Sequence, residues 1–180
     1  MPQRVERCAR VCRPIDVPLP THIQHMNANQ LSFQFISEPT DVNFGGKVHG
    51  GVVMKWIDQT AFACACAWSQ SYCVTIYVGG IRFYKPILIG DIVRVDARII
   101  YTGNTSMHIA IDVLSKPVTA QDFLKTTHCI IVFAAVDEHG KTRPVPKWQA
   151  LTEQEIQLEQ YAIKLMDMRK QIEVEMKAFF

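Results

Sequence analysis

The sequence predicts an α+β fold in which a curved antiparallel sheet wraps round one long central helix, with a second helix at the C-terminus. Two observations support this fold. Residues 52–68 are apolar on nearly every side, which a helix lying on a surface would not be. Four segments that alternate apolar and polar side chains follow, separated by short turns. A sheet curved round the helix encloses such a segment.

Composition narrows the classes of function. The chain has 180 residues, 48% of them hydrophobic and 20% charged, which suits one domain with accessory segments. A net charge of +2 and the lack of zinc-finger spacing argue against nucleic acid as a partner. No apolar run reaches the roughly 20 residues of a membrane span. We therefore expect a soluble, cytoplasmic protein with no membrane partner.

Residues 1–30 are expected to form an N-terminal arm outside the core. Four arginines at a spacing of three weakly resemble an organelle transit peptide. Prolines at positions 14, 18 and 20 would end a helix early, so a mobile arm is the preferred interpretation. The main domain is expected over residues 31–148 and a C-terminal helix over residues 149–180.

The first elements follow from local pattern. Leu31–Ser37 alternates as a strand does, and the turn-rich stretch "EPTDVNFGGKVHGG" follows it. Gly50 and Gly51 begin the long helix. Because that helix is apolar nearly all round, it should be enclosed on most sides.

The four later strands are predicted at Cys73–Tyr84, Ile92–Tyr101, Ser106–Leu114 and Thr126–Val136. In the second of these, Val93, Val95, Ala97, Ile99 and Tyr101 should share the core face, opposite Arg94, Asp96 and Arg98. The short stretches "KPILIGD" and "TGNT" predict antiparallel hairpins. Gly79 and Gly80 indicate a bulge or a close approach.

The C-terminal segment 149–180 is predicted to form a helix that begins with a capping box formed by Thr152 and Glu155. Its apolar residues lie among many charges, so it could pack on its own sheet or on a neighbouring protomer. The six cysteines mostly lie in apolar segments and indicate buried structural thiols in a reduced compartment. Cys64 and Cys66 point apart on a helix, which disfavours a metal site that would also use Cys73 and His128.

Four stretches together resemble the hotdog-fold acyl-CoA thioesterases, in the branch of YciA-type and brain cytosolic acyl-CoA hydrolases. They are "DVNFGGKVHGGVVMKWID", "IRFYKPILIGDIVRV", "YTGNTSMHIAIDV" and "VFAAVDEHGKTRPVPKW". The resemblance covers about residues 31–148, in order. It implies hydrolysis of acyl-CoA without metal or cofactor, by a homodimer at least or a hexamer built as a trimer of dimers.

The resemblance also implies site residues. The family's "D-x-N-x-x-G-x-x-x-G-G" loop is matched by Asp41, Asn43, Gly46, Gly50 and Gly51, and its catalytic helix carboxylate by Asp58. Asn43 would act on water or the thioester from the facing subunit. The path of coenzyme A would be lined by Val74, Thr75, Gly103, Asn104, Thr105 and Ser106. Asn104 stands where family members often carry a basic residue.

Physical chemistry gives these residues roles in thioester hydrolysis. Asp58 lies seven residues after Gly51, about 10 Å along the same helix face, so both can border one pocket. The carboxylate would activate water, and free N–H groups beside Gly50 and Gly51 would stabilise the oxyanion. The alternatives are a buried, hydrogen-bonded Asp58 and a turn-forming Asn43.

Several other polar residues have more than one possible role. His49 could be a general base, although capping the helix is the preferred role. Pairs of His128 with Ser69 or Cys73 lack the context of a Ser or Cys hydrolase. Arg82, Lys85, Lys125 and Arg143 are candidate phosphate contacts or simply solvated charges. A non-catalytic acyl-CoA binding or sensing module is the alternative function, and a hydratase lacks its histidine motif.

Overall fold

The computed structural model describes residues 29–179, so the predicted arm lies almost wholly outside the described residues. The elements follow the expected order along the chain. They are β1 (Gln30–Ile36), the one-turn 3-10 helix η1 (Pro39–Asp41), α1 (Gly50–Ser69), β2 (Tyr72–Phe83), β3 (Ile92–Thr102), β4 (Ser106–Lys116), β5 (Leu124–Val136) and α2 (Glu153–Met176).

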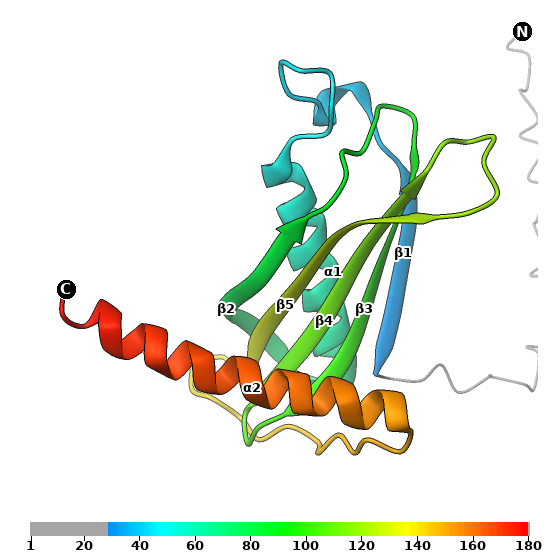
Figure 1. Cartoon of the computed structure of the whole chain (residues 1–180). Coiled ribbons are helices and arrows are strands. Elements are labelled where there is room, and N and C mark those ends of the chain that lie inside the picture. The colour runs from blue at the N-terminus through cyan, green and yellow to red at the C-terminus, as the bar shows by residue number, and fades with distance from the viewer. Residues whose placement is uncertain (1–28, 180) are drawn as a thin grey trace, which may run out of the picture.

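One antiparallel sheet joins the five strands in the order β1-β3-β4-β5-β2. Helix α1 lies along one face of this curved sheet, behind it in Figure 1, and α2 crosses the other face near the lower ends of the strands. We call the face toward α1 the inner face and the face toward α2 the outer face. This arrangement confirms the predicted fold class.

The predicted hairpin between β2 and β3 is wrong. β3 and β4 do form the hairpin expected from "TGNT", but β2 pairs with β5 at the far edge of the sheet. The connection 84–91 has hydrogen bonds of its own, from the Val48 N–H to the Ile87 carbonyl and from the Ser37 N–H to the Asp91 carbonyl, and Ile87 is buried. It is therefore a packed crossover, longer than a hairpin turn.

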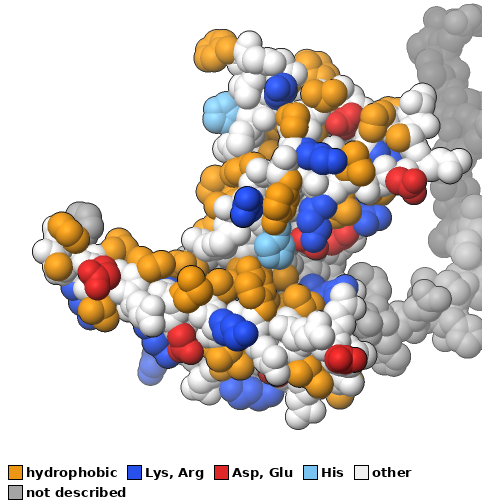
Figure 2. Space-filling model, viewed as in Figure 1, with side chains coloured by type: hydrophobic (Ala, Val, Ile, Leu, Met, Phe, Trp, Pro, Cys, Tyr) orange, Lys and Arg blue, Asp and Glu red, His pale blue; other side chains and the backbone are white. Residues whose placement is uncertain are grey.

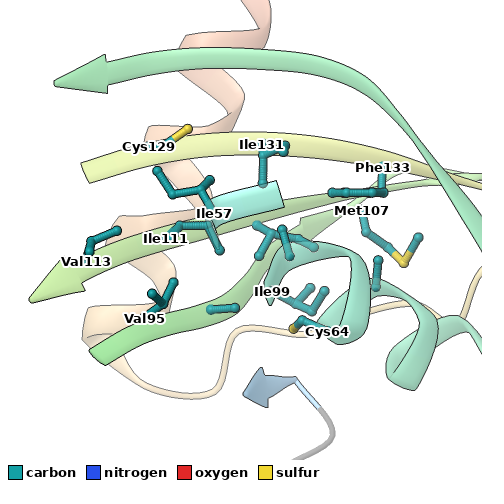
Figure 3. Packing of buried hydrophobic residues seen from close by; sticks show 14 of the residues in the cluster. Ile57, Cys64, Val95, Ile99, Met107, Ile111, Val113, Cys129, Ile131 and Phe133 are labelled. Carbon is teal, nitrogen blue, oxygen red and sulfur yellow. The ribbon is translucent and has the colours of Figure 1, made fainter. Parts of the chain in front are cut away.

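The main core lies between α1 and the inner face. Alternate residues of the strands point at the helix, and Ile57 and Cys64 of α1 meet them (Figure 3). The strand residues labelled there are Val95, Ile99, Met107, Ile111, Val113, Cys129, Ile131 and Phe133. Each of these is at most 1% exposed, so the packing leaves them no contact with solvent.

A bulge corrects one detail of the predicted face of β3. The register shifts between Ile99 and Tyr101, so Ile99 faces Ile109 while Tyr101 pairs with His108. Tyr101 then joins Ile100 on the outer face, where Ile100 packs with Ala162 of α2 and Tyr101 packs against them. Period-two alternation fails there because a bulge inserts one extra residue into the strand.

Only one side of α1 is covered by the sheet of its own protomer. The buried residues of the helix are Val53, Ile57, Thr60, Ala61, Cys64 and Ala65. Met54 is 43% exposed, and Asp58 and Gln59 are exposed beside it. The expectation that the helix is enclosed on most sides is therefore wrong for residues 29–179 of a single chain, because a five-stranded sheet curves round only part of the helix.

β2 is an edge strand of 12 residues that pairs on one side only. The predicted bulge is confirmed, since the register shifts between Gly79 and Arg82 and Gly80 adopts φ +61°. Large apolar side chains stand exposed along the strand, among them Tyr72 at 63% and Phe83 at 50%. A long apolar edge is a surface that proteins normally cover.

Helix α2 packs on the outer face of its own sheet, which decides between the two placements left open by the sequence. Ala162 is fully buried against Ile100 and Ile130, with Leu158 and Leu165 beside them. The predicted capping box is confirmed, because Thr152 Oγ1 accepts from the Glu155 N–H and the Glu155 carboxylate accepts from the Thr152 N–H. The C-terminal half of α2 projects past β2 (Figure 1).

His108 lies beneath α2 and is 6% exposed. Burial, followed by the positive charge of Arg169, lowers the pKa of His108 to about 4. In the unfolded chain a histidine titrates near pH 6.5. Between these two values the unfolded chain binds more protons than the folded one, so stability falls as the pH drops from about 6.5 toward 4.

We therefore expect His108→Asn to lose much of the acid sensitivity of the fold. The full difference in pKa corresponds to a decrease of about 3 kcal/mol in the free energy of unfolding on acidification. Urea unfolding of both proteins at pH 7 and pH 4.5, at one protomer concentration, measures it. The carboxylates of the chain contribute equally in both proteins. An identical decrease in the free energy of unfolding between pH 7 and pH 4.5 in wild type and variant would therefore contradict this role of His108.

Candidate active site

A hollow between α1 and β2 contains the predicted helix residues. Gly51, Met54, Lys55 and Asp58 line it from one face of α1, at helical spacings of three and four. Val78 and Ile81 of β2 face them, and Ile57 and Ile131 complete the lining. The prediction that Gly51 and Asp58 border one pocket is confirmed. The prediction missed Met54 and Lys55, which the helical period could have found.

Asp58 is held by a threonine from the edge strand. Thr75 Oγ1 donates to Asp58 Oδ1 at 2.7 Å. Within residues 29–179, Asp58 Oδ2 accepts no hydrogen bond, so one carboxylate oxygen is fixed by Thr75 and the other has no partner there. Asp58 is exposed in the single chain, and the bond from Thr75 is one that a merely structural carboxylate would also accept.

The start of α1 is capped by His49, as preferred from the sequence. His49 Nδ1 accepts from the Gly51 N–H at 2.9 Å, and the His49 carbonyl accepts from Val52 and Val53. The Gly50 N–H finds no acceptor in residues 29–179. Of the two predicted donors, therefore, Gly50 is free and Gly51 is engaged. A side chain at Gly51 would place its Cβ 3.2 Å from His49 Nδ1, so glycine keeps this cap unstrained.

Asn43 lies in the loop before α1 and forms a turn. Its Oδ1 accepts from the Gly45 N–H at 2.8 Å, the bond expected of a turn-forming asparagine. Asn43 does not line the hollow that holds Gly51 and Asp58 in the same chain. In the single chain, Asn43 therefore stands apart from the residues that line the hollow.

The remaining predicted residues gather at one end of the sheet. Val74 and Ser106 both pair with Ala134, so they lie on one row, about 10 Å apart across two strand spacings. The turn between β3 and β4 is closed by a bond from the Gly103 N–H to the Ser106 carbonyl at 2.9 Å. Thr75 is next to Val74, so the strand residues and the turn share that end, whereas Gly50 lies at the opposite end of α1.

The outer face carries a separate polar cluster. His128 Nδ1 lies 2.7 Å and Lys125 Nζ 2.9 Å from Asp112 Oδ1. Burial acts to raise the pKa of Asp112, but hydrogen bonds from His128 and Lys125 outweigh it and lower that pKa. Figure 2 shows basic, acidic and histidine side chains together above α2. Ser69 and Cys73 lie together at the end of α1, where they contact each other and not His128.

The described cysteines behave as structural thiols. Burial raises the pKa of Cys64 to about 12 and those of Cys73 and Cys129 to about 11, so these thiols stay protonated. Cys8 and Cys12 lie outside the described residues. Residues 29–179 contain no group of three or more His, Cys, Asp or Glu side chains placed to hold a metal ion. Nor does any helix among them have the length and apolarity to cross a membrane.

Comparisons with protein families, with curated proteins and with solved structures all point to the same family. The thioesterase superfamily model matches residues 45–120. Protein VdlD of Helicobacter pylori is 33% identical over 147 residues, which cover 82% of this chain and 84% of that protein. The acyl-CoA thioester hydrolase YciA of Salmonella typhimurium is 31% identical over 129 residues, covering 70% and 97%.

Solved structures with the same fold are acyl-CoA thioesterases as well. An apo-hexameric acyl-CoA thioesterase has a TM-score of 0.77 at 29% identity, covering 80% of this chain and 92% of its own. An acyl-CoA hydrolase from Staphylococcus aureus, solved with butyryl coenzyme A and coenzyme A, has a TM-score of 0.78 at 25% identity, covering 85% and 93%. Variants of the latter replace an asparagine, an aspartate 15 positions later and a threonine 17 positions after that by alanine.

The cap at the start of α1 can be tested by its effect on stability. We expect His49→Ala to lower the free energy of unfolding by about 1 kcal/mol, because the Gly51 N–H loses its acceptor. His49→Asn should recover most of that loss, because asparagine caps helices well. His139→Ala, in an exposed turn, serves as the matched control. Equal urea midpoints for His49→Ala and the control would show that His49 does not cap α1.

Proposed function

The chain belongs to the thioesterase superfamily and is an acyl-CoA thioester hydrolase, and from this premise we propose that it releases fatty acids from fatty acyl-CoA. The hollow that contains Gly51 and Asp58 is the observation that carries the proposal. It joins a helix N-terminus, which attracts developing negative charge, to a carboxylate that can accept a proton. These are the two groups that hydrolysis of a thioester needs.

The intervals between polar residues support the same site. Asn43, Asp58 and Thr75 are separated by 15 and 17 positions, as are the asparagine, aspartate and threonine replaced in the Staphylococcus aureus hydrolase. In this chain, two of the three are in direct contact through the bond from Thr75 to Asp58. We therefore assign these three side chains to the catalytic site.

Asp58 activates the attacking water in this proposal. Thr75 fixes Oδ1, so the carboxylate cannot rotate freely, and Oδ2 accepts the proton of a water in the hollow. The hydroxide equivalent then attacks the thioester carbonyl carbon. As the tetrahedral intermediate collapses, the carbon–sulfur bond breaks, and the proton held by Asp58 passes to the leaving thiolate.

Backbone N–H groups at the start of α1 stabilise the oxyanion. The Gly50 N–H has no acceptor among residues 29–179 and lies at the positive end of a 20-residue helix. The Gly51 N–H joins it when His49 releases its bond. The absence of side chains at both positions lets the carbonyl oxygen approach the donors.

A second copy of the chain completes the site. The open face of α1 and the apolar edge of β2 adjoin the same hollow, and pairing of β2 with its copy would cover both. The loop of Asn43 then reaches the Asp58 of the facing protomer, where its side-chain amide orients water or the thioester. We propose a homodimer as the minimum unit and a trimer of dimers as the full assembly, in line with the hexameric neighbours.

Further parts of the proposal follow the path of the substrate. Val74, Thr75 and the turn 103–106 lie at one end of the sheet and line the way of coenzyme A from the thioester to its nucleotide. No metal or organic cofactor takes part. The cytoplasm is the proposed location, and similar proteins include one named cytosolic acyl coenzyme A thioester hydrolase in rat, of which this chain spans 38%.

We expect Asp58→Asn to lower kcat for acyl-CoA by about a hundred- to ten-thousand-fold, because an amide cannot accept the proton of water. Binding of coenzyme A and the oligomeric state should survive, since the amide keeps the shape and the bond from Thr75. Thiol release from a panel of acyl-CoAs, read with a thiol-reactive dye, measures the loss. Asp122→Asn, an exposed carboxylate outside the hollow, is the matched control.

The same panel separates the two candidate functions. A wild-type protein that binds acyl-CoA of every chain length without releasing thiol would be a binding or sensing module. Full turnover by Asp58→Asn in a hydrolytically active protein would instead overturn the assignment of the base while leaving the reaction in place.

A further inference from the structure

The turn between β3 and β4 is held by a distant stretch of chain. Residues 141–148, between β5 and α2, run along it (Figure 1). The Val145 N–H donates to the Asn104 carbonyl at 3.0 Å, and the Trp148 N–H donates to Thr102 Oγ1 at 2.9 Å. Lys147 Nζ donates to the Gly103 carbonyl at 3.0 Å. Three contacts therefore fix this basic stretch against the turn.

The charged side chains of residues 141–148 are all positive, and they lack acidic partners within the described residues. Lys141, Arg143 and Lys147 are exposed, and none forms a salt bridge within the described residues. The nearest carboxylates in sequence are otherwise engaged, because Asp137 accepts from backbone N–H groups of its own turn and Glu138 pairs with His139. Lys147, bonded only to a neutral carbonyl, can take an anionic partner as well.

The turn itself presents hydrogen-bond donors beside Lys147. In the part of the chain that the structure describes, no acceptor meets the backbone N–H groups of Asn104 and Thr105. Successive free N–H groups next to a cation favour a phosphate, whose oxygens accept several hydrogen bonds at once.

The distance to the reacting centre fits a phosphate of coenzyme A. Trp68 Nε1 donates to the Pro146 carbonyl at 3.0 Å, which ties this stretch to the last turn of α1. Asp58 lies ten residues before Trp68 on the same helix, or about 15 Å along its axis. An extended pantetheine arm, which separates the thioester from the nucleotide phosphates, has a length of this order.

We propose that Lys147, together with the backbone N–H groups of Asn104 and Thr105, binds a phosphate of the coenzyme A nucleotide. This inference rests on the proposed function. It also accounts for the neutral Asn104, because Lys147 brings the positive charge to the turn from a different part of the chain. Lys147 is then a specificity residue, which distinguishes a nucleotide-bearing thioester from a shorter one.

The test compares one acyl group on two carriers, coenzyme A and pantetheine, the latter without any nucleotide. For Lys147→Met we expect KM for the acyl-CoA to rise about tenfold, the size of one charge-assisted hydrogen bond, with kcat unchanged. KM for the acyl-pantetheine should stay at the wild-type value. Lys147→Arg should keep most of the affinity for acyl-CoA because the positive charge remains.

Two further variants separate charge from structure. Lys147→Gln keeps a donor for the Gly103 carbonyl but loses the charge, so it should behave as Lys147→Met if phosphate binding is the role. Lys164→Met, an exposed lysine on α2, is the matched control and should leave both substrates unaffected. Added salt should raise KM for acyl-CoA less in Lys147→Met than in wild type, because one screened contact is gone.

The possible results separate phosphate binding by Lys147, shaping of the turn by Lys147 and the hydrolase activity itself. An equal rise in KM for both carriers, or a loss in Lys147→Met that Lys147→Gln restores, would show that Lys147 only shapes the turn and would overturn the inference. Unchanged KM for acyl-CoA in Lys147→Met would do the same. If wild type hydrolyses neither carrier, the proposed function fails first, and the two failures are thus distinguishable.

Discussion

A five-stranded sheet can bury only one face of the helix that lies on it, and the rest of this molecule follows from that limit. The sheet covers Ile57, Ala61 and Cys64, while Met54 and Asp58 remain open. The apolar character of α1 all round therefore indicates a second covering surface, which residues 29–179 of the same protomer do not supply. The long apolar edge of β2 lies beside the open face of α1, so one partner surface would cover both.

The geometry of one helix places both halves of the proposed chemistry in that opening. The Gly51 backbone lies at its start and the Asp58 carboxylate lies two turns along the same face, while the free Gly50 N–H stands one residue before Gly51. The structure adds two constraints on this arrangement. His49 accepts from the Gly51 N–H, which leaves Gly50 as the free donor in the described part of the helix start, and Thr75 fixes one oxygen of Asp58. The proposed donor and the proposed base are thus in place before any substrate binds, which is the condition for electrostatic preorganisation.

Local pattern predicted what depends on local geometry. The seven-residue interval placed Gly51 and Asp58 on one face, and the capping box at Thr152 was found where expected. The predictions were wrong where pairing with other strands decided the structure. A bulge turned Tyr101 to the outer face, and a packed crossover placed β2 at the far edge of the sheet, away from β3. The contacts of Thr75 with Asp58 and of Lys147 with Gly103 join residues 17 and 44 positions apart, and no helical or strand period marks such pairs.

The central claim is that each active site combines Asn43 of one protomer with Asp58 of the other. Mixed dimers of Asn43→Ala and Asp58→Asn chains, isolated with a different affinity tag on each chain, test it most directly. If the sites are shared, both substitutions fall in one site and leave the other intact, so the mixed dimer should recover about half of the wild-type turnover, although each parent is nearly inactive. A mixed dimer as inactive as its parents would contradict the account, because it would mean that both residues act within one chain.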